Sequence, residues 1–392
     1  MTLTFKRDTV FWTISMQVAI VNFYLGGFGP GQPLLRADQG TSLTVAGLHG
    51  TAMGIASIIA GFVNARLVHI FGRKKLTWLG LILFCVGVFI FVISPPVQLT
   101  LFATLLSGLG ISTVVNNMVT RLSNHLGPKA PHAIAQASGI ASAGYILGTI
   151  LIGTLAGTSI SWRLGLLLVI PVAIGLAIAV RGNLLEEAHV QDASGPQSGK
   201  LSRAYWIAWA GFFACICTEF GTTFWAAALL RDRVGSTAAI ATLAIVAFGI
   251  GMGLGRWFGG LALQRLHLDI QAITLMTIQF AGFIIFWFSH NMLLSLFALF
   301  AMGLGVSMQF ALVSIRLIAL SDGRPDLAMG RSSLAAGLAI ALAPFILGLL
   351  GDNFGISRAY VMVPILIVFA VASIVFVPTE RAQSRGAREL QN

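Results

Sequence analysis

The sequence predicts an all-α membrane protein with twelve transmembrane helices in two pseudo-symmetric six-helix bundles. Three observations lead to this fold class. The composition is 57% hydrophobic and 9% charged with a mean hydropathy of +0.89, far from that of a soluble domain. Apolar runs on the order of 20 residues, each long enough to cross a bilayer, recur along all 392 residues. The second half of the chain also repeats parts of the first.

Twelve apolar runs follow one another along the chain. They occupy residues 11–33, 43–67, 76–95, 98–121, 132–157, 163–180, 205–229, 237–263, 270–289, 292–319, 328–351 and 359–378. No small-residue cleavage site follows a short apolar core in the first run, so we expect a retained span and not a removable signal peptide. Little of the chain is left for a soluble domain.

Lys and Arg are divided unequally between the two sides of this topology. With a cytoplasmic N-terminus, all but five of the 24 Lys and Arg residues fall in cytoplasmic segments. The exceptions are Arg36, Arg163, Arg231, Arg233 and Arg358. This is the positive-inside pattern, so we expect a multi-pass protein of the cell (inner) membrane with both termini in the cytoplasm. Topology then accounts for the net charge of +11, and we expect no nucleic-acid partner.

The most polar internal segment divides the spans six and six. It predicts an N-terminal six-helix bundle over 1–180, a cytoplasmic linker over 181–203, a C-terminal six-helix bundle over 204–380 and a cytoplasmic tail over 381–392. The halves match at an offset of 195 residues, which places FATLLSGLGISTVVNNMVTRL (102–122) over FALFAMGLGVSMQFALVSIRL (297–317). Such parallel repeats are typical of alternating-access transporters, whose substrate site lies between the halves near the bilayer midplane.

The duplicated twelve-span pattern resembles the major facilitator superfamily over nearly the full length. Between spans 2 and 3, ARLVHIFGRKKL (65–76) is similar to the loop signature of that family. Gly72, Arg73 and Lys74 match its basic end, whereas Ala65 replaces the usual Gly and His69 the usual Asp. The resemblance implies that this loop holds one inward- or outward-facing state through charge contacts, with a weaker latch at His69.

Two arginines that the repeat superposes, Arg121 and Arg316, end spans 4 and 10 on the cytoplasmic side. We expect them, together with His69, Gly72, Arg73 and Lys74, to act in gating. Contacts with lipid headgroups would suit the same two arginines, and the alternative is that they serve only as topology signals.

Glu219 is the most unusual residue of the chain. It lies inside GFFACICTEFGTTFWA (211–226), whereas the other 12 of the 13 acidic residues lie in predicted loops, tails or span ends. An acid at mid-bilayer costs about 2.5 kcal/mol or more, so such residues usually face a cavity or a partner. We therefore predict that Glu219 is the proton-coupling residue; the alternative is a neutral Glu that hydrogen bonds between helices. The repeat superposes Tyr24 on Glu219, which suggests that the two face each other across the cavity.

The resemblance also implies that spans 1, 4, 7 and 10 line the central cavity. Their polar and aromatic side chains are the candidate substrate ligands, although each could instead bridge helices: Gln17, Asn22, Tyr24, Asn116, Asn117, Thr222, Thr223, Trp225 and Gln309. No cation lies in the middle of these four spans, which favours a neutral or cationic solute. Arg256 of span 8 is expected to extend towards the cytoplasm.

Several other classes of function fail on context. The glycines of FGIGMGLGRWFGG (248–260) lie in an apolar span, so they indicate helix packing through Gly251, Gly255 and Gly259 and not a dinucleotide site. No nucleotide loop, metal-ligand spacing or catalytic triad is found in the sequence. We therefore expect no enzyme activity and no cofactor, and a monomer as the working unit in the lipid bilayer.

Together these features predict secondary active transport by alternating access, most simply proton-coupled symport of a small neutral or cationic polar solute. Proton-driven antiporters of the family carry an Arg four residues before the span-4 Gly, where this chain has Thr104, and a Gly-Pro pair in span 5 that is absent here. The alternatives are proton-driven efflux of amphipathic compounds, uniport, and a receptor with this fold that does not transport.

Overall fold

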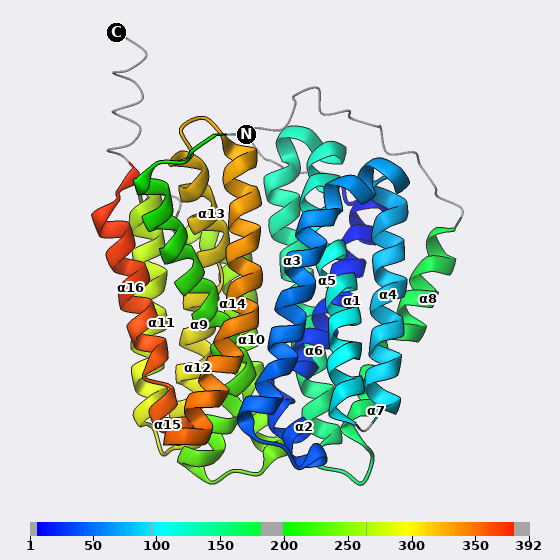
Figure 1. Ribbon diagram of the computed structural model, residues 1–392, viewed down its shortest axis with the longest axis vertical. Helices are drawn as coiled ribbons and strands as arrows, with labels where there is room; N and C mark the ends of the chain where they lie inside the picture. The colour runs from blue at the N-terminus through cyan, green and yellow to red at the C-terminus, as the bar shows by residue number, and fades with distance from the viewer. Residues whose placement is uncertain (1–5, 95, 182–198, 264, 380–392) are drawn as a thin grey trace.

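The computed structural model describes residues 6–94, 96–181, 199–263 and 265–379. Most of the predicted linker and all of the predicted tail lie outside these residues. Twelve helical segments in the described part are long and apolar enough to cross a membrane, as the sequence predicts. They form two bundles that stand side by side (Figure 1).

The N-terminal bundle contains six spans, of which the sixth is interrupted. The elements are α1 (Thr9–Phe28), α2 (Gln32–Gln39), α3 (Leu43–Phe71), α4 (Arg73–Ile93), α5 (Val97–Leu126), the 3-10 turn η1 (Gly127–Lys129), α6 (Ala130–Leu155), α7 (Trp162–Leu166) and α8 (Val169–Val180). The predicted first span ran to residue 33, but α1 stops at Phe28 because GPG follows at 29–31, and α2 is a separate short helix.

The C-terminal bundle has the same order of spans, with interruptions in the tenth and twelfth. The elements are α9 (Arg203–Val234), α10 (Ala238–Leu263), α11 (Leu268–Phe288), α12 (Met292–Val306), α13 (Gln309–Ala319), α14 (Pro325–Phe354), α15 (Ile356–Ala359) and α16 (Met362–Phe376). Residues 307 and 308 break the tenth span in its middle. This break proves important for the site.

Polar residues at the helix ends set where the spans begin and end. Ser42 and Ser202 accept hydrogen bonds from the backbone N–H groups of Val45 and Tyr205, and so cap α3 and α9. Gly40 ends α2 and Gly235 ends α9, both in the left-handed region, with φ of 60° and 69°. These glycines are 195 residues apart, so the sequence repeat is also a repeat of backbone conformation.

The bundles meet along two helix pairs, α3 with α14 and α6 with α10. Small residues allow the close approach: a Cβ added at Gly54 of α3 would overlap the backbone of Gly337 and Ala341 in α14. Likewise, Gly253 of α10 lies against Ser142 of α6. Such close packing of small residues stabilises helix pairs in a bilayer. The hydrophobic effect does not drive helices together there, because the lipid tails are as apolar as the helix surfaces.

Hydrogen bonds across the bundles gather towards one end of the molecule. This end, which contains α2 and α15, is opposite the end at which α1 begins and α16 finishes, here called the terminal end (Figure 1). The Asp352 carboxylate accepts from the N–H groups of Leu43 and Thr44 at 2.9 and 2.7 Å, and Thr242 donates to the carbonyl of Pro30 at 3.3 Å. The bundles are thus joined at the α2/α15 end.

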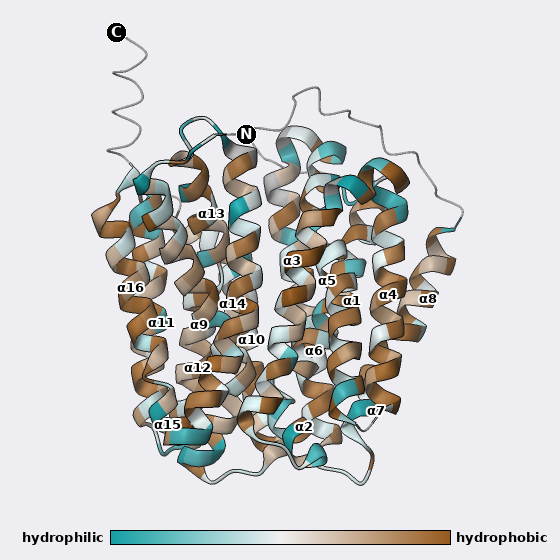
Figure 2. Ribbon diagram, viewed as in Figure 1, coloured by the Kyte–Doolittle hydropathy of each residue, from teal (hydrophilic) through white to brown (hydrophobic). Residues whose placement is uncertain are grey.

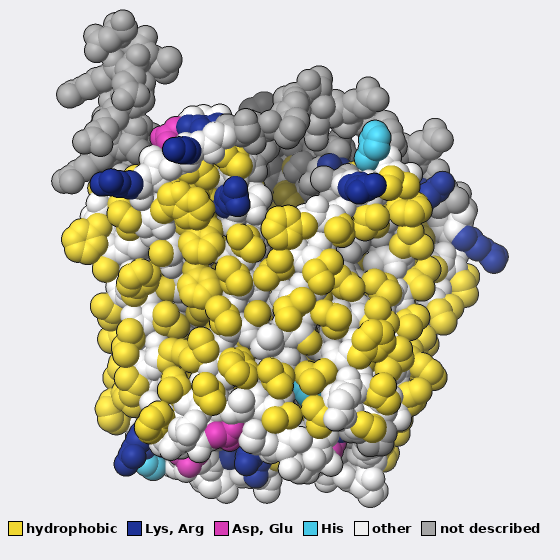
Figure 3. All heavy atoms as spheres, viewed as in Figure 1, with side chains coloured by type: hydrophobic (Ala, Val, Ile, Leu, Met, Phe, Trp, Pro, Cys, Tyr) yellow, Lys and Arg dark blue, Asp and Glu magenta, His cyan; other side chains and the backbone are white. Residues whose placement is uncertain are grey.

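The surface matches a bilayer. Hydrophobic residues cover the middle of the helices and hydrophilic ones lie towards both ends (Figure 2). In the space-filling view, apolar side chains form a broad band across the visible face, and Lys and Arg lie near its edges (Figure 3). This band is the exposed apolar surface that a lipid environment would cover.

Candidate functional site

Glu219 lies near the middle of the 32-residue helix α9 and is only partly buried. Two polar side chains from other helices interact with it electrostatically: Arg256 of α10 and Tyr145 of α6. The acid of the C-terminal bundle therefore interacts electrostatically with a cation of its own bundle and with a phenol of the opposite bundle.

Arg256 connects three helices at this point. Its Nε donates to the carbonyl of Ser307 at 3.3 Å, and its Nη1 donates to Oγ of Ser142 at 3.1 Å. Ser307 lies in the break between α12 and α13, and Ser142 is the thirteenth residue of the 26-residue helix α6. A backbone carbonyl in a helix break is an acceptor that lies at membrane depth without exposure to lipid.

The glycine ridge of α10 explains why Arg256 reaches this position. A Cβ at Gly251 would overlap the carbonyl of Phe300, and one at Gly255 would overlap the side chain of Ser307. The ridge thus packs α10 against the broken tenth span, as the glycine spacing predicts. The expectation that Arg256 extends towards the cytoplasm is wrong, because its guanidinium finds hydrogen-bond acceptors within the protein.

Tyr24 does not face Glu219. Its ring stacks on Phe28 at 5.1 Å between centroids and meets Phe84 edge-on at 5.5 Å, so it is buried within the N-terminal bundle. Tyr145 instead is the phenol that interacts electrostatically with Glu219, and its hydroxyl has no hydrogen-bond partner in the described part of the chain. The 195-residue offset superposes positions of the two bundles but does not bring them into contact.

The three candidates that follow Glu219 on α9 differ in environment. Thr222 is 1% exposed, and its hydroxyl has no hydrogen-bond partner among the described residues. Thr223 donates to the carbonyl of Phe220 at 3.3 Å. Trp225 is fully buried and donates from Nε1 to the carbonyl of Pro344 at 2.8 Å, which ties α9 to α14.

Among the candidates of spans 1 and 10, three side chains bond to their own or neighbouring helices. Gln17 accepts from Nη1 of Arg121 at 3.1 Å, and Asn22 donates to the carbonyl of Val18 at 2.9 Å. Gln309 donates to Oε1 of Gln279 at 2.7 Å, and the Gln279 amide in turn donates to Thr218 at 3.1 Å. Gln17 and Gln309 are both buried and bridge helices.

The structure separates the neighbouring asparagines of span 4. Asn117 is fully buried, donates to Oδ1 of Asn64 on α3 at 3.0 Å and accepts from Arg73 at 3.4 Å. Asn116 is exposed. The two asparagines therefore differ in burial, and Asn117 is the one that is packed between helices.

Of the predicted gating residues, Arg73 bonds to span 4 as described, and Gly72 joins α3 to α4 with a φ of 74°. His69 is exposed. Arg316 is fully buried, and its Nε pairs with Asp269 of α11 at 2.5 Å. Its repeat partner, Arg121, donates a hydrogen bond to Oε1 of Gln17.

Sequence reasoning did not assign Arg256 or Tyr145 to the site because both lie outside the four spans expected to line the cavity. A usable signal was present for Arg256, a cation within an apolar run directly after the glycine ridge. For Tyr145 we find none. Among the described residues, no group of three or more His, Cys, Asp or Glu side chains could hold a metal ion.

Comparisons with known proteins place this geometry in context. A family model described as Major Facilitator Superfamily matches residues 14–284 and 207–392. Multidrug resistance protein 1 of Bacillus subtilis (strain 168) is 25% identical over 149 residues, which span 36% of this chain and 38% of that protein. A solved bacterial homologue of the human lysosomal transporter Spinster, in an inward-facing and occupied conformation, superposes with a TM-score of 0.70 at 13% identity, covering 98% of each chain. At that identity the likeness concerns the fold.

Proposed function

The chain belongs to the major facilitator superfamily, and from this premise we propose that it is a proton-coupled secondary transporter of a small polar solute. Its fold is that of a multi-pass membrane transporter. We propose further that it works as a monomer in the cell membrane by alternating access between the two bundles.

The observation that carries the proposal is the hydrogen bond from Arg256, which interacts electrostatically with Glu219, to Ser142 of the opposite bundle. An ionised Glu219 attracts the guanidinium, whereas a protonated Glu219 does not. Proton binding therefore changes the force on a side chain that bonds both bundles. A ligand that acts differently on two arrangements shifts the equilibrium between them, and here the ligand is a proton.

Glu219 and Arg256 together also restrict the charge that we expect for the solute. The sequence argument for a neutral or cationic solute rested on the absence of a cation from spans 1, 4, 7 and 10. Arg256 of span 8 would repel a cationic solute, so it weakens the cationic half of that argument. With both side chains ionised, the pair has no net charge. We therefore favour a neutral polar solute, with exposed Asn116 as a hydrogen-bonding candidate. Thr222 and Thr223 remain candidates on the helix of Glu219.

The positive-inside distribution supports a cytoplasmic location for the terminal end. Hydrogen bonds across the bundles at Asp352 and Thr242 then lie towards the outside. On this assignment the molecule is closed to the exterior, and Glu219 exchanges its proton with the cytoplasm. His69, Gly72, Arg73, Lys74, Arg121 and Arg316 would act in the return to the outward-facing state.

The test uses Glu219→Gln in proteoliposomes, after a thermal-shift screen of sugars, amino acids and nucleosides has identified a solute. We expect the variant to lose accumulation driven by a pH gradient while it still binds the solute and exchanges it at equilibrium. Asp232→Asn is the matched control, since it makes the same chemical change at an exposed position of α9. Unchanged pH-driven uptake by Glu219→Gln would refute the coupling role.

A second function, proton-driven efflux of amphipathic compounds, is favoured by the partial match to Multidrug resistance protein 1. Imposing a pH gradient of each sign separates the two. Symport moves solute down the proton gradient and antiport moves it up. Solute binding without flux under either gradient would instead indicate a receptor that does not transport.

A further inference from the structure

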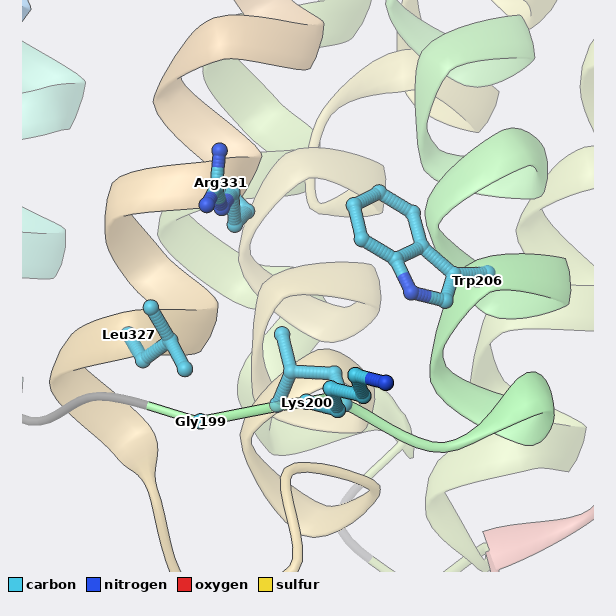
Figure 4. A pocket seen from close by; sticks show the side chains of 6 residues that line it. Gly199, Lys200, Trp206, Leu327 and Arg331 are labelled. Carbon is cyan, nitrogen blue, oxygen red and sulfur yellow. The ribbon is translucent and has the colours of Figure 1, made fainter.

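At the terminal end of the C-terminal bundle, a pocket of about 280 Å³ lies between the first turns of α9 and α14. The residues that line it are Gly199, Lys200, Leu201, Trp206, Leu327 and Arg331. Figure 4 shows the Trp206 indole on α9 across from Arg331 and Leu327 on α14, with Lys200 on the segment that leads into α9. Nothing in the transport mechanism above uses these residues.

The charge of the pocket is positive. Its six described lining residues include two cations, Lys200 and Arg331, and no carboxylate. A third cation lies close to Gly199: a Cβ added at Gly199 would overlap Nη1 of Arg324. Gly199 has a φ of 123°, which only glycine adopts without strain, so the backbone can pass this close to the guanidinium. The site would therefore suit a ligand with a concentrated negative charge.

The remaining wall of the pocket is apolar. Trp206 is 45% exposed, and Leu327 faces it from α14. Trp206 and Glu219 are 13 positions apart on α9, which places them about 140° apart around the helix at 100° per residue. The pocket is thus on a different face of α9 from the proposed transport site. Tryptophan together with Lys and Arg at a helix end is typical of the membrane–water interface.

We propose that this pocket binds the headgroup of an anionic phospholipid. Lys200 and Arg331 hold the phosphate oxygens, and Trp206 and Leu327 pack against the first part of an acyl chain. Basic pockets between transmembrane helices are suited to such headgroups, and a guanidinium offers phosphate a bidentate partner. A soluble phosphate would use only the charged half of the pocket, so the combination of charge and exposed indole favours the lipid. The proposal is independent of the proposed transport activity.

Native mass spectrometry of the purified full-length protein tests it, with phosphatidylglycerol and phosphatidylcholine as the probes. We expect Lys200→Gln/Arg331→Gln to bind phosphatidylglycerol about 30-fold more weakly than the wild type, the factor that about 1 kcal/mol of attraction per cation gives. Binding of phosphatidylcholine should not change. The charge-preserving Lys200→Arg/Arg331→Lys should retain phosphatidylglycerol, which guards against a simple loss of folding.

Arg66→Gln/Arg265→Gln is the matched control, because it removes two exposed cations from other elements of the terminal end. Equal phosphatidylglycerol affinity in the wild type, the pocket variant and this control would overturn the proposal. Displacement of the lipid by millimolar inorganic phosphate alone would show a soluble phosphate site, and would overturn the lipid assignment too.

Tryptophan fluorescence gives a second, position-specific readout. Phosphatidylglycerol brominated near the carboxyl end of its acyl chains should quench the wild type more than Trp206→Phe, whereas brominated phosphatidylcholine should quench both alike. Equal loss of fluorescence with the two lipids in the wild type would contradict a specific lipid at this pocket.

Discussion

Arg256 of the C-terminal bundle, which interacts electrostatically with Glu219, donates a hydrogen bond of 3.1 Å to Ser142 of the N-terminal bundle. Both residues lie well inside their helices, away from the contacts at the α2/α15 end. The bond therefore joins the two bundles near the proposed proton site. Each of the following predictions tests one contact of this kind.

Removal of the acceptor should loosen the bundles near the site. Ser142→Ala deletes a hydrogen bond to a charged group, worth about 1.5–3 kcal/mol, and should shift the population towards greater separation of the bundles at the terminal end. Electron–electron distance measurements between spin labels on α5 and α13, in a cysteine-free background, would detect it. Ser138→Ala, one turn away on α6, is the control. Identical distance distributions in both variants would argue against a bridging role for Ser142.

Asp352 should protect the backbone N–H groups in the first turn of α3 from hydrogen exchange. Its carboxylate accepts from the N–H groups of Leu43 and Thr44 across the bundle interface, and Asp352→Asn removes the charge that favours a helix N-terminus by roughly 0.3–1 kcal/mol. Hydrogen exchange of a peptide covering residues 41–50 should become severalfold faster. Asn353→Ala is the control, because the Asn353 side chain donates to the Leu349 carbonyl of its own helix, and it should leave exchange unchanged; equal rates in both variants would refute the cap.

Two glycines of α3 should respond differently to the same added methyl group. A Cβ at Gly54 would overlap the backbone of α14, whereas at Gly61 the nearest atom is the Ser333 Cβ at 3.9 Å. Gly54→Ala should destabilise the folded protein by about 1–3 kcal/mol, as overpacking does, and Gly61→Ala should be neutral or stabilising. Thermal unfolding in detergent measures this. A similar melting temperature for both variants would contradict the tight α3–α14 contact.

The ion pair of Arg316 with Asp269 should stabilise the protein far more than the contact of Asp8 with His125 near α1. Asp269→Asn leaves the buried guanidinium without its countercharge, which costs about 3–5 kcal/mol. Asp8→Asn disrupts a pair with His125 whose side chains are 36% and 28% exposed, and such exposed pairs contribute about 0–1 kcal/mol. Melting temperatures compare the two. Recovery in Asp269→Asn/Arg316→Gln would confirm that the unpaired charge is the cause.

Much of the fold could be predicted because hydrophobicity and repeats are properties of the chain itself. Twelve apolar runs gave twelve spans, and the glycine ridge at Gly251 and Gly255 gave the contact of α10 with the tenth span. The interruption at residues 307 and 308 could not be predicted, because the repeat-related segment with the same Gly-x-Gly-x-Ser pattern, residues 108–112, lies in the continuous helix α5.

The sequence by itself determined the membrane fold, its duplication and the unusual position of Glu219, because the cost of placing an acid among apolar residues is readable without coordinates. Only the tertiary structure decided which side chains surround that acid. The repeat pointed to Tyr24, but aromatic packing with Phe28 and Phe84 buries it in its own bundle. Arg256 and Tyr145 are the side chains that interact electrostatically with Glu219. The sequence could not identify them, because the periodicity of a helix defines its faces and not the helix that packs against each face.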